Sequence, residues 1–204
     1  YKNLQNQPKS TETTSTGSCG ELLNYSINNE KLIFQGSGPM TNYNSNSLPP
    51  WSSLSSTIKT IEFPENITRI GSYAFYNCIS LTNIIIPNNV NSIGTYAFYH
   101  CTSLQKFTMP PKVTVISQYL FHGCKVLSSI EIHDEVDSIG SYAFYNCTSL
   151  RSFIIPTKVT SISSYLFGGC KSLTSIKIHD EVDFIGDYAF YFCELLQNFI
   201  IPPK

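Results

Sequence analysis

Charge is scarce in this sequence: Asp, Glu, Lys and Arg make up 13% of the 204 residues, and the formal net charge is −1. A domain that binds nucleic acid carries a basic patch or stripe, and the sequence has neither, which excludes nucleic acid as a partner. Runs of about 18 apolar residues, which a membrane-spanning helix needs, are also missing. We therefore expect no membrane-spanning segment.

Helical periodicity is missing as well. No segment between Gly and Pro breakers is long enough and regular enough, at a period of about 3.6 residues, to predict an amphipathic helix. The apolar positions instead repeat every 23 residues without insertion or deletion, and a cysteine recurs at the same place in six successive repeats. These cysteines are Cys78, Cys101, Cys124, Cys147, Cys170 and Cys193. A fixed period of this size is typical of a solenoid, in which each repeat stacks on the one before it.

The composition divides the chain into three regions. Residues 1–17 are rich in Thr, Ser, Asn and Gln, and they bury too little apolar surface to offset the entropy of ordering, so we predict a flexible tail or linker. Residues 18–57 contain two apolar β segments on either side of a short Asn-rich turn at 28–30, which indicates a β-hairpin. We predict that this hairpin and Trp51, the only tryptophan, cap the first repeat, and that residues 58–204 form the repeats.

Each repeat begins Leu-x-x-Ile-x-Ile and continues with a Pro or His-Asp turn, a Val-x-x-Ile segment and a return that ends in Phe and Cys. At the end of the first segment, inward apolar residues alternate with outward residues, as they do in a β-strand. We therefore predict a mainly β fold: a right-handed leucine-rich-repeat solenoid of about seven 23-residue rungs with an N-terminal β-hairpin cap.

This repeat resembles the BspA-like, or Treponema-type, leucine-rich repeat family, and residues 81–101 carry the pattern almost without departure. The matching residues are Leu81, Ile84, Ile86, Pro87, Val90, Ile93, Gly94, Ala97, Phe98 and Cys101. Segments 17–20, 36–40 and 50–51 are similar to the amino-terminal cap of that family. The resemblance covers about residues 17–204. It implies a cell-surface or secreted protein of a bacterium or a parasitic protozoan that binds host matrix proteins, other cells or glycans.

Pairs of rungs form a longer repeat. Residues 116–158 and 162–204 are identical at 30 of 43 positions, so a unit of 46 residues has been copied. No core position changes type between the two copies. The differences fall at positions that we expect to face solvent or a partner, such as Glu131 and its counterpart Lys177.

Three groups of residues have side chains that catalysis or metal binding uses, and each has a structural explanation. The cysteine column fits buried thiols that pack as small apolar side chains, although rungs about 4.8 Å apart also permit disulfides between neighbours. His133 and His179 lie in two His-Asp-Glu-Val-Asp turns, roughly 10 Å apart and too distant to share one ion. His100 and Cys101 are sequence neighbours, which rarely face each other. We therefore predict no catalytic residue, no metal site, no cofactor and no enzymatic activity.

Tyrosines form two further columns, and tyrosine is common at binding surfaces because it combines apolar area with a polar tip. The first column is Tyr73, Tyr96, Tyr119, Tyr142, Tyr165 and Tyr188. The second column is Tyr76, Tyr99, Tyr145 and Tyr191. We assign the first column to packing between rungs. Whether the second column packs or binds a partner stays open.

The outward positions of the first strand of each rung are the candidate binding site. Solenoid curvature makes this concave face the usual binding surface, and seven rungs give a strip about 30 Å long. Isoleucines lie there among amides, hydroxyls and single charges. The candidate residues are Thr60, Glu62, Asn83, Ile85, Lys106, Thr108, Ser129, Glu131, Ser152, Ile154, Ser175, Lys177, Asn198 and Ile200.

We therefore expect a cell-surface or secreted adhesion or recognition module that binds an extracellular protein or glycoprotein. The alternative is a structural stalk that presents another domain and has no ligand of its own. The sequence begins at Tyr1 rather than Met, and it ends in Pro202-Pro203-Lys204 without a cap. We expect a fragment of a longer protein, whose uncapped C-terminal rung associates end to end with a second copy.

Overall fold

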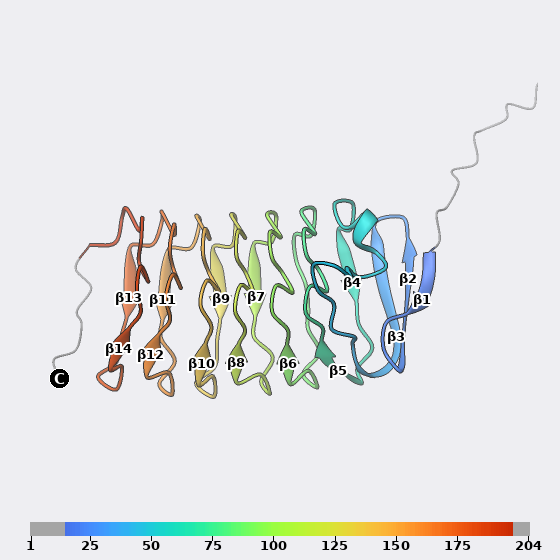
Figure 1. Cartoon of the computed structure of the whole chain (residues 1–204), viewed down its shortest axis with the longest axis horizontal. Helices are drawn as coiled ribbons and strands as arrows, with labels where there is room; N and C mark the ends of the chain where they lie inside the picture. The colour runs from blue at the N-terminus through green and yellow to red at the C-terminus, as the bar shows by residue number, and fades with distance from the viewer. Residues whose placement is uncertain (1–14, 198–204) are drawn as a thin grey trace, which may run out of the picture.

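An antiparallel hairpin opens the described part of the chain, residues 15–197 of a computed structural model (Figure 1). Strand β1 (Ser15–Ser18) pairs with β2 (Leu22–Asn28), and β2 pairs with β3 (Lys31–Pro39) across a turn in which Asn29 has a φ of 55°. Asn tolerates this left-handed conformation better than most residues. The predicted hairpin with its Asn-rich turn is therefore confirmed.

One boundary differs from the prediction. Residues 15–17, expected in the flexible tail, belong to β1, because their backbone groups pair with β2 in a register that starts at Ser15 and Ile27. Backbone pairing of this kind does not need apolar side chains, so composition alone missed it. The described residues contain six rungs, counted by their second strands, against about seven predicted. The seventh would begin at Leu196 and lies almost wholly outside the described residues.

Trp51 closes the first rung, as predicted. Its side chain is only 1% exposed, and its Nε1 donates a hydrogen bond to the carbonyl of Ala74 at 2.7 Å. Tyr25, Phe34 and Tyr43 pack edge-on against the indole, with ring centroids 5.1–5.7 Å away. The indole therefore covers the apolar end that a terminal repeat leaves open.

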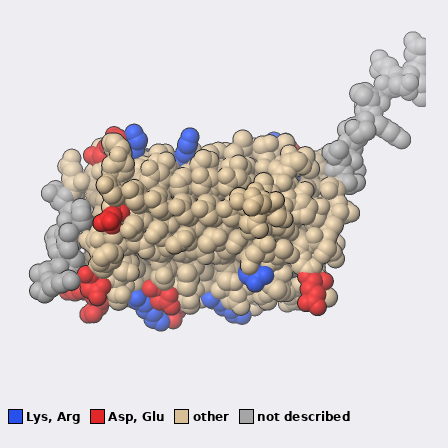
Figure 2. All heavy atoms as spheres, in the orientation of Figure 1, with Lys and Arg blue, Asp and Glu red and all other residues tan. Residues whose placement is uncertain are grey.

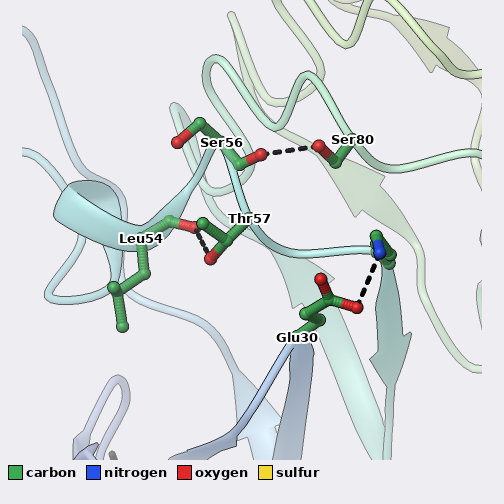
Figure 3. Close-up of polar contacts among 6 residues, drawn as sticks. Glu30, Leu54, Ser56, Thr57 and Ser80 are labelled. Carbon is green, nitrogen blue, oxygen red and sulfur yellow. Dashed lines mark hydrogen bonds and ion pairs between the residues drawn. The ribbon is translucent and has the colours of Figure 1, made fainter.

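Three polar contacts lie near the short 3₁₀ helix η1 (Ser52–Leu54), as Figure 3 shows; two of them join the cap to the first rungs, and the contact of Thr57 with Leu54 lies within the cap. The three contacts are Ser80 Oγ to Ser56 O at 2.6 Å, Thr57 Oγ1 to Leu54 O at 2.8 Å, and the ion pair of Lys59 with Glu30 at 2.8 Å. The ion pair is exposed and contributes at most about 1 kcal/mol. The buried indole therefore contributes more to the attachment of the cap.

Strands of the rungs form two rows that run along the long axis of the molecule (Figure 1). The first strands are β4 (Thr60–Glu62), β7 (Lys106–Thr108), β9 (Ser129–Glu131), β11 (Ser152–Ile154) and β13 (Ser175–Lys177). The second strands are β5 (Ile67–Ile70), β6 (Ser92–Ile93), β8 (Val115–Ile116), β10 (Ser138–Ile139), β12 (Ser161–Ile162) and β14 (Phe184–Ile185). Pairings within both rows are parallel.

Identical side chains stack in columns to form the core. Phe75, Phe98, Phe121, Phe144 and Phe167 are fully buried, and their ring centroids lie 5.4–5.7 Å apart from rung to rung. Offset stacking at this spacing is favourable for aromatic rings. The fixed 23-residue period therefore places each phenylalanine on its equivalent in the next rung.

We call the segment from the Gly or Ser position to the cysteine of each rung the back wall; in the first rung it is residues 71–78. Every second N–H in the back wall donates along the solenoid axis to the next rung. In the first rung these bonds run from Tyr73, Phe75 and Asn77 to the carbonyls of Thr95, Ala97 and Tyr99, at 2.8–3.0 Å. The same three bonds recur at all five interfaces between the six rungs. The hydrogen bonds of the back wall therefore continue without a gap from the first rung to the sixth.

Two positions in each back wall have a left-handed backbone. The first is the tyrosine column from Tyr73 to Tyr188, with φ between 56° and 60°. The second holds Asn77, His100, Gly123, Asn146, Gly169 and Phe192. Asn and Gly adopt this conformation readily, whereas a tyrosine there needs compensation from its surroundings. The tyrosine rings supply it by stacking at 4.5–4.9 Å, which confirms the packing role expected for the first column.

The strand rows, unlike the back wall, are interrupted. In the second row β5 pairs with β6, β8 with β10 and β12 with β14, and in the first row β7 pairs with β9 and β11 with β13. Within residues 15–197 no pairing joins β6 to β8, β10 to β12 or β9 to β11. Over the last four rungs the pairing repeats with the same 46-residue period as the sequence.

The residue that opens the back wall differs between paired and unpaired rungs. At a paired interface the Gly140 N–H donates to Ile116 O at 2.8 Å, and a Cβ on Gly140 would lie 2.5 Å from the Gln118 nitrogen. At an unpaired interface Ser117 takes this position, and its Oγ donates to Ile93 O at 2.5 Å. The equivalent serine 46 residues later makes the same bond. The alternation of Gly and Ser therefore follows the alternation of strand pairing.

Candidate binding face

We call the outward side of the first strands, together with residues 83 and 85 of the second rung, the strand face. Asn198 and Ile200 lie outside the described residues, and the other twelve candidate residues are all exposed. On each strand they alternate with inward residues; Phe107, between Lys106 and Thr108, is 2% exposed. The structure thus brings these side chains onto one surface, and their role in binding stays a prediction.

Two isoleucines are uncovered on the strand face. The side chain of Ile85 is 80% exposed and that of Ile154 is 64% exposed. A single exposed aliphatic side chain needs no explanation. Here, however, clefts adjoin both residues: Ile85 lines clefts of about 420 and 470 Å³, and Ile154 lines one of about 480 Å³. Each isoleucine is therefore an apolar anchor point next to a hollow.

The charges of the strand face are partly neutralised. Glu62 forms an ion pair with Lys31, and Glu131 accepts a hydrogen bond from Thr108 Oγ1 at 3.1 Å. Within residues 15–197 no ion pair or hydrogen bond involves the ammonium groups of Lys106 and Lys177. Exposed contacts of this kind are worth at most about 1 kcal/mol each, so a partner exchanges them at low cost. Figure 2 shows few charges on the broad surface between the two long margins of the molecule.

The second rung interrupts the first row of strands. Residues 83–85 form no strand, and neither β4 nor β7 pairs with them. Asn83 Oδ1 accepts a hydrogen bond from the N–H of Ile84 at 3.0 Å, so this N–H bonds to a side chain and not to a backbone carbonyl of a neighbouring rung. Asn competes with ladder hydrogen bonds in this way and is depleted in strands. Sequence reasoning missed this feature, and Asn83 was the signal that could have indicated it.

The cysteine column consists of free thiols, and five of its six members are buried. From Cys101 onward each Sγ of the column donates to the carbonyl of the phenylalanine 26 residues earlier, at 3.1–3.2 Å. Burial raises the pKa of the Cys78 thiol to about 12. The thiols are therefore protonated at neutral pH and serve as packed donors, as the interpretation as buried structural thiols required.

The histidine motifs also have structural contacts. The Nε2 atoms of His133 and His179 lie 2.9 Å from the carbonyl oxygens of Pro110 and Pro156 in the preceding rungs. The neighbour of His100, Cys101, directs its thiol to a backbone carbonyl. Over residues 15–197 no three His, Cys, Asp or Glu side chains lie close enough to hold a metal ion. Each turn histidine thus joins two rungs of a pair.

The second tyrosine column packs between rungs over the first four rungs. Tyr76 stacks on Tyr99 at 4.9 Å, Tyr99 on His122 at 4.6 Å, and His122 on Tyr145 at 5.0 Å. The column stops at Gly168, where a Cβ would lie 2.7 Å from the Tyr145 ring. The predicted column did not include His122, which continues the stack between Tyr99 and Tyr145.

Among the histidines, His122 has the pKa that its surroundings shift most. Burial, and secondarily the neighbouring His100, lower its pKa from the ordinary 6.5 to about 4. Its Nδ1 is buried and has no hydrogen-bond partner within the described residues. The imidazole is therefore neutral at physiological pH, and it acts here as a flat ring in a stack.

Solved structures of bacterial leucine-rich repeat proteins share this fold. The T. pallidum leucine-rich repeat protein matches with a TM-score of 0.69 at 21% identity, over 89% of this chain and 91% of that one. A leucine-rich repeat protein from Eubacterium ventriosum matches with a TM-score of 0.60 at 22% identity over 87% of this chain, which spans 63% of that protein. One from Bacteroides ovatus gives 0.59 at 27% identity, over 72% and 44% of the two chains.

No curated protein matches the sequence. Among residues 15–197, no helix has the length and apolar character that a membrane span requires. The family model described as "BspA type Leucine rich repeat region (6 copies)" matches residues 52–136 and 114–204, which is most of the chain. Leucine-rich repeats of this kind are protein-interaction modules and typically lack enzymatic activity. The chain belongs to the BspA-type leucine-rich repeat family.

Proposed function

We propose that the chain is a recognition module that binds an extracellular protein or glycoprotein through the strand face, and that it works at a cell surface or after secretion. One observation carries the proposal: the twelve described candidate residues are all exposed on one surface, where Ile85 and Ile154 stand uncovered among polar side chains. Apolar anchors inside a polar surround are typical of interfaces that exclude water on binding.

The test is capture by the isolated chain on an array of purified extracellular proteins and glycoproteins. A strand-face variant carries Lys106→Glu, Glu131→Lys and Lys177→Glu, and a control carries Lys112→Glu and Lys158→Glu, which lie in the turns between the two strand rows. We expect the strand-face variant to lose binding and the control to keep it. Equal binding by both variants would refute the strand face as the site.

A stalk is the second candidate, and the unbroken back wall favours it. Three axial hydrogen bonds at each of five interfaces resist extension along the solenoid, as a spacer requires. Failure of the chain to capture any protein on the array, with thermal unfolding intact, would favour the stalk over the recognition module.

End-to-end association through the last rung stays a prediction, because the edge concerned lies outside the described residues. Sedimentation of the chain across a range of concentrations tests it. A single monomer species at high concentration would count against such association.

A further inference from the structure

We propose that the second rung of the strand face is a docking site for an extended polypeptide segment of the partner. Two apolar side chains of the segment straddle Ile85 and enter the clefts on either side of it, and an acidic side chain pairs with Lys106. This inference rests on the proposed function, and it names the place and the chemistry of the contact.

The backbone at this rung offers free hydrogen-bonding groups. Ile84 N–H bonds to the side chain of its own neighbour Asn83, and Thr82 O accepts from Gln105 N at 3.2 Å. No hydrogen bond within residues 15–197 uses the N–H groups of Asn83 and Ile85 or the carbonyls of residues 83–85. Backbone N–H and C=O groups need hydrogen-bond partners when a ligand covers them, so a polypeptide that crosses this rung can supply those partners from its own backbone.

The clefts lie on both sides of the rung. Toward the first rung a cleft of about 470 Å³ is lined by Ile61, Phe63 and Ile86 among others. Toward the third rung a cleft of about 420 Å³ is lined by Phe107 and Met109, with Lys106 at the same cleft. Same-side residues i and i+2 of an extended chain lie about 6.6 Å apart, which suits two hollows separated by a single rung.

Charge and apolarity together favour polypeptide as the occupant. Lys106 lines the cleft toward the third rung, and its ammonium group has no ionic partner among the described residues; Glu65 lines the cleft toward the first rung. A segment with an acidic side chain at one end and a basic one at the other complements both. A neutral glycan supplies neither the charges nor the apolar side chains that these clefts would bury.

The experiment pans a phage-displayed library of random nonapeptides on the full chain and measures the affinity of the selected peptides, made synthetically, by fluorescence polarisation. We expect apolar residues two positions apart and a nearby acidic residue. Ile85→Asp should weaken binding at least ~10-fold, a loss expected when an interface anchor is removed. Lys106→Glu should reverse the preference from acidic to basic peptides.

Ile154→Asp makes the same change at the equivalent strand position three rungs further on, and it shows whether the peptide binds elsewhere on the strand face. Leu22→Asp is the matched control, because it makes the same change at an exposed aliphatic side chain on β2, outside the strand face. We expect both variants to change affinity less than ~2-fold, well below the effect of removing an anchor. Hydrogen exchange gives a second readout: peptide binding should slow exchange at the Asn83 and Ile85 amides. Circular dichroism confirms that each variant is folded.

The outcomes separate this proposal from the broader one. Affinity that falls with Ile154→Asp but not with Ile85→Asp would overturn the second-rung site and leave the strand face as the binding surface. Selected peptides that ignore both substitutions, or no selected peptide at all, would overturn the docking of an extended segment. In either case the protein array still decides whether the strand face binds at all.

Discussion

Acidification should weaken the solenoid at His122, and His122→Tyr should remove that weakness. The imidazole lies in the second tyrosine column, between Tyr99 and Tyr145, with the His100 ring at 5.5 Å. Protonation would place a charge on a ring whose Nδ1 is buried and has no partner among the described residues. Tyrosine occupies this column in neighbouring rungs, so the substitution keeps a ring in the stack and removes the charge change.

The sign of the effect follows from the direction of the pKa shift. His122 has a pKa of about 4 in the folded chain against an ordinary 6.5, so between these values the unfolded chain binds more protons. Stability is therefore complete above about pH 6.5 and declines as the pH falls toward 4. A tenfold difference in proton affinity corresponds to about 1.4 kcal/mol, which sets an upper limit near ~3 kcal/mol. Because the ring is partly exposed, solvent screening reduces this to about 1–2 kcal/mol.

Urea unfolding of the parent chain, His122→Tyr and His122→Phe at pH 7.5, 5.5 and 4.5 tests the reasoning. Carboxylates titrate equally in all three chains, so the informative quantity is the difference in unfolding free energy between parent and variant at each pH. We expect this difference to grow in favour of both variants by about 1–2 kcal/mol between pH 7.5 and 4.5. A difference that does not change with pH would refute the assignment of the low pKa to the buried ring.

Three further predictions concern the rung interfaces, the cap and the thiols. Gly140→Ser should cost about 1–3 kcal/mol through the clash of its Cβ with the neighbouring backbone, whereas Ser117→Gly should lose only one hydrogen bond, about 1 kcal/mol; equal costs in urea unfolding would contradict the role of glycine at paired interfaces. Trp51→Phe should cost about 1–3 kcal/mol by leaving a buried carbonyl unpaired, and Trp51→Ala about 3–5 kcal/mol by adding a cavity; thermal unfolding measures both, and a cap that docks without the indole would show neither loss. At pH 8 a thiol reagent should label the folded chain slowly, because burial raises the pKa of Cys78 to about 12, with the half-buried Cys193 reacting first; rapid labelling of several thiols would contradict their burial.

The sequence alone was sufficient to predict the solenoid and its core. A side chain that recurs every 23 residues must occupy the same place in each rung, so the buried phenylalanine and cysteine columns follow from the period. Two-residue alternation likewise placed Lys106 and Thr108 outward around Phe107. These features depend on which side of a strand a residue occupies, and that is a local property of the sequence.

The interruptions of the strand rows could not be predicted from the sequence, because they depend on distances between rungs. Whether β9 pairs with the following rung depends on how closely the two backbones approach, and at that interface Ser163 bonds to the Ile139 carbonyl in another part of the coil. The clefts beside Ile85 are lined by residues of neighbouring rungs, so they too depend on contacts between rungs. A column of residue types records what a rung contains and not how far it lies from its neighbour.

The alternation of interfaces gives a physical reason for a duplication of two rungs and not one. A paired interface needs glycine at the position of Gly140, and an unpaired interface uses the hydroxyl of a serine such as Ser117. Copying a single rung would place two interfaces of one kind in succession, so a serine Cβ would meet a closely approaching backbone or a glycine would leave a carbonyl without its donor. Copying 46 residues preserves the alternation. Because the back wall bonds identically at both kinds of interface, the strand rows of such a protein are free to vary in pairs while its spine stays continuous.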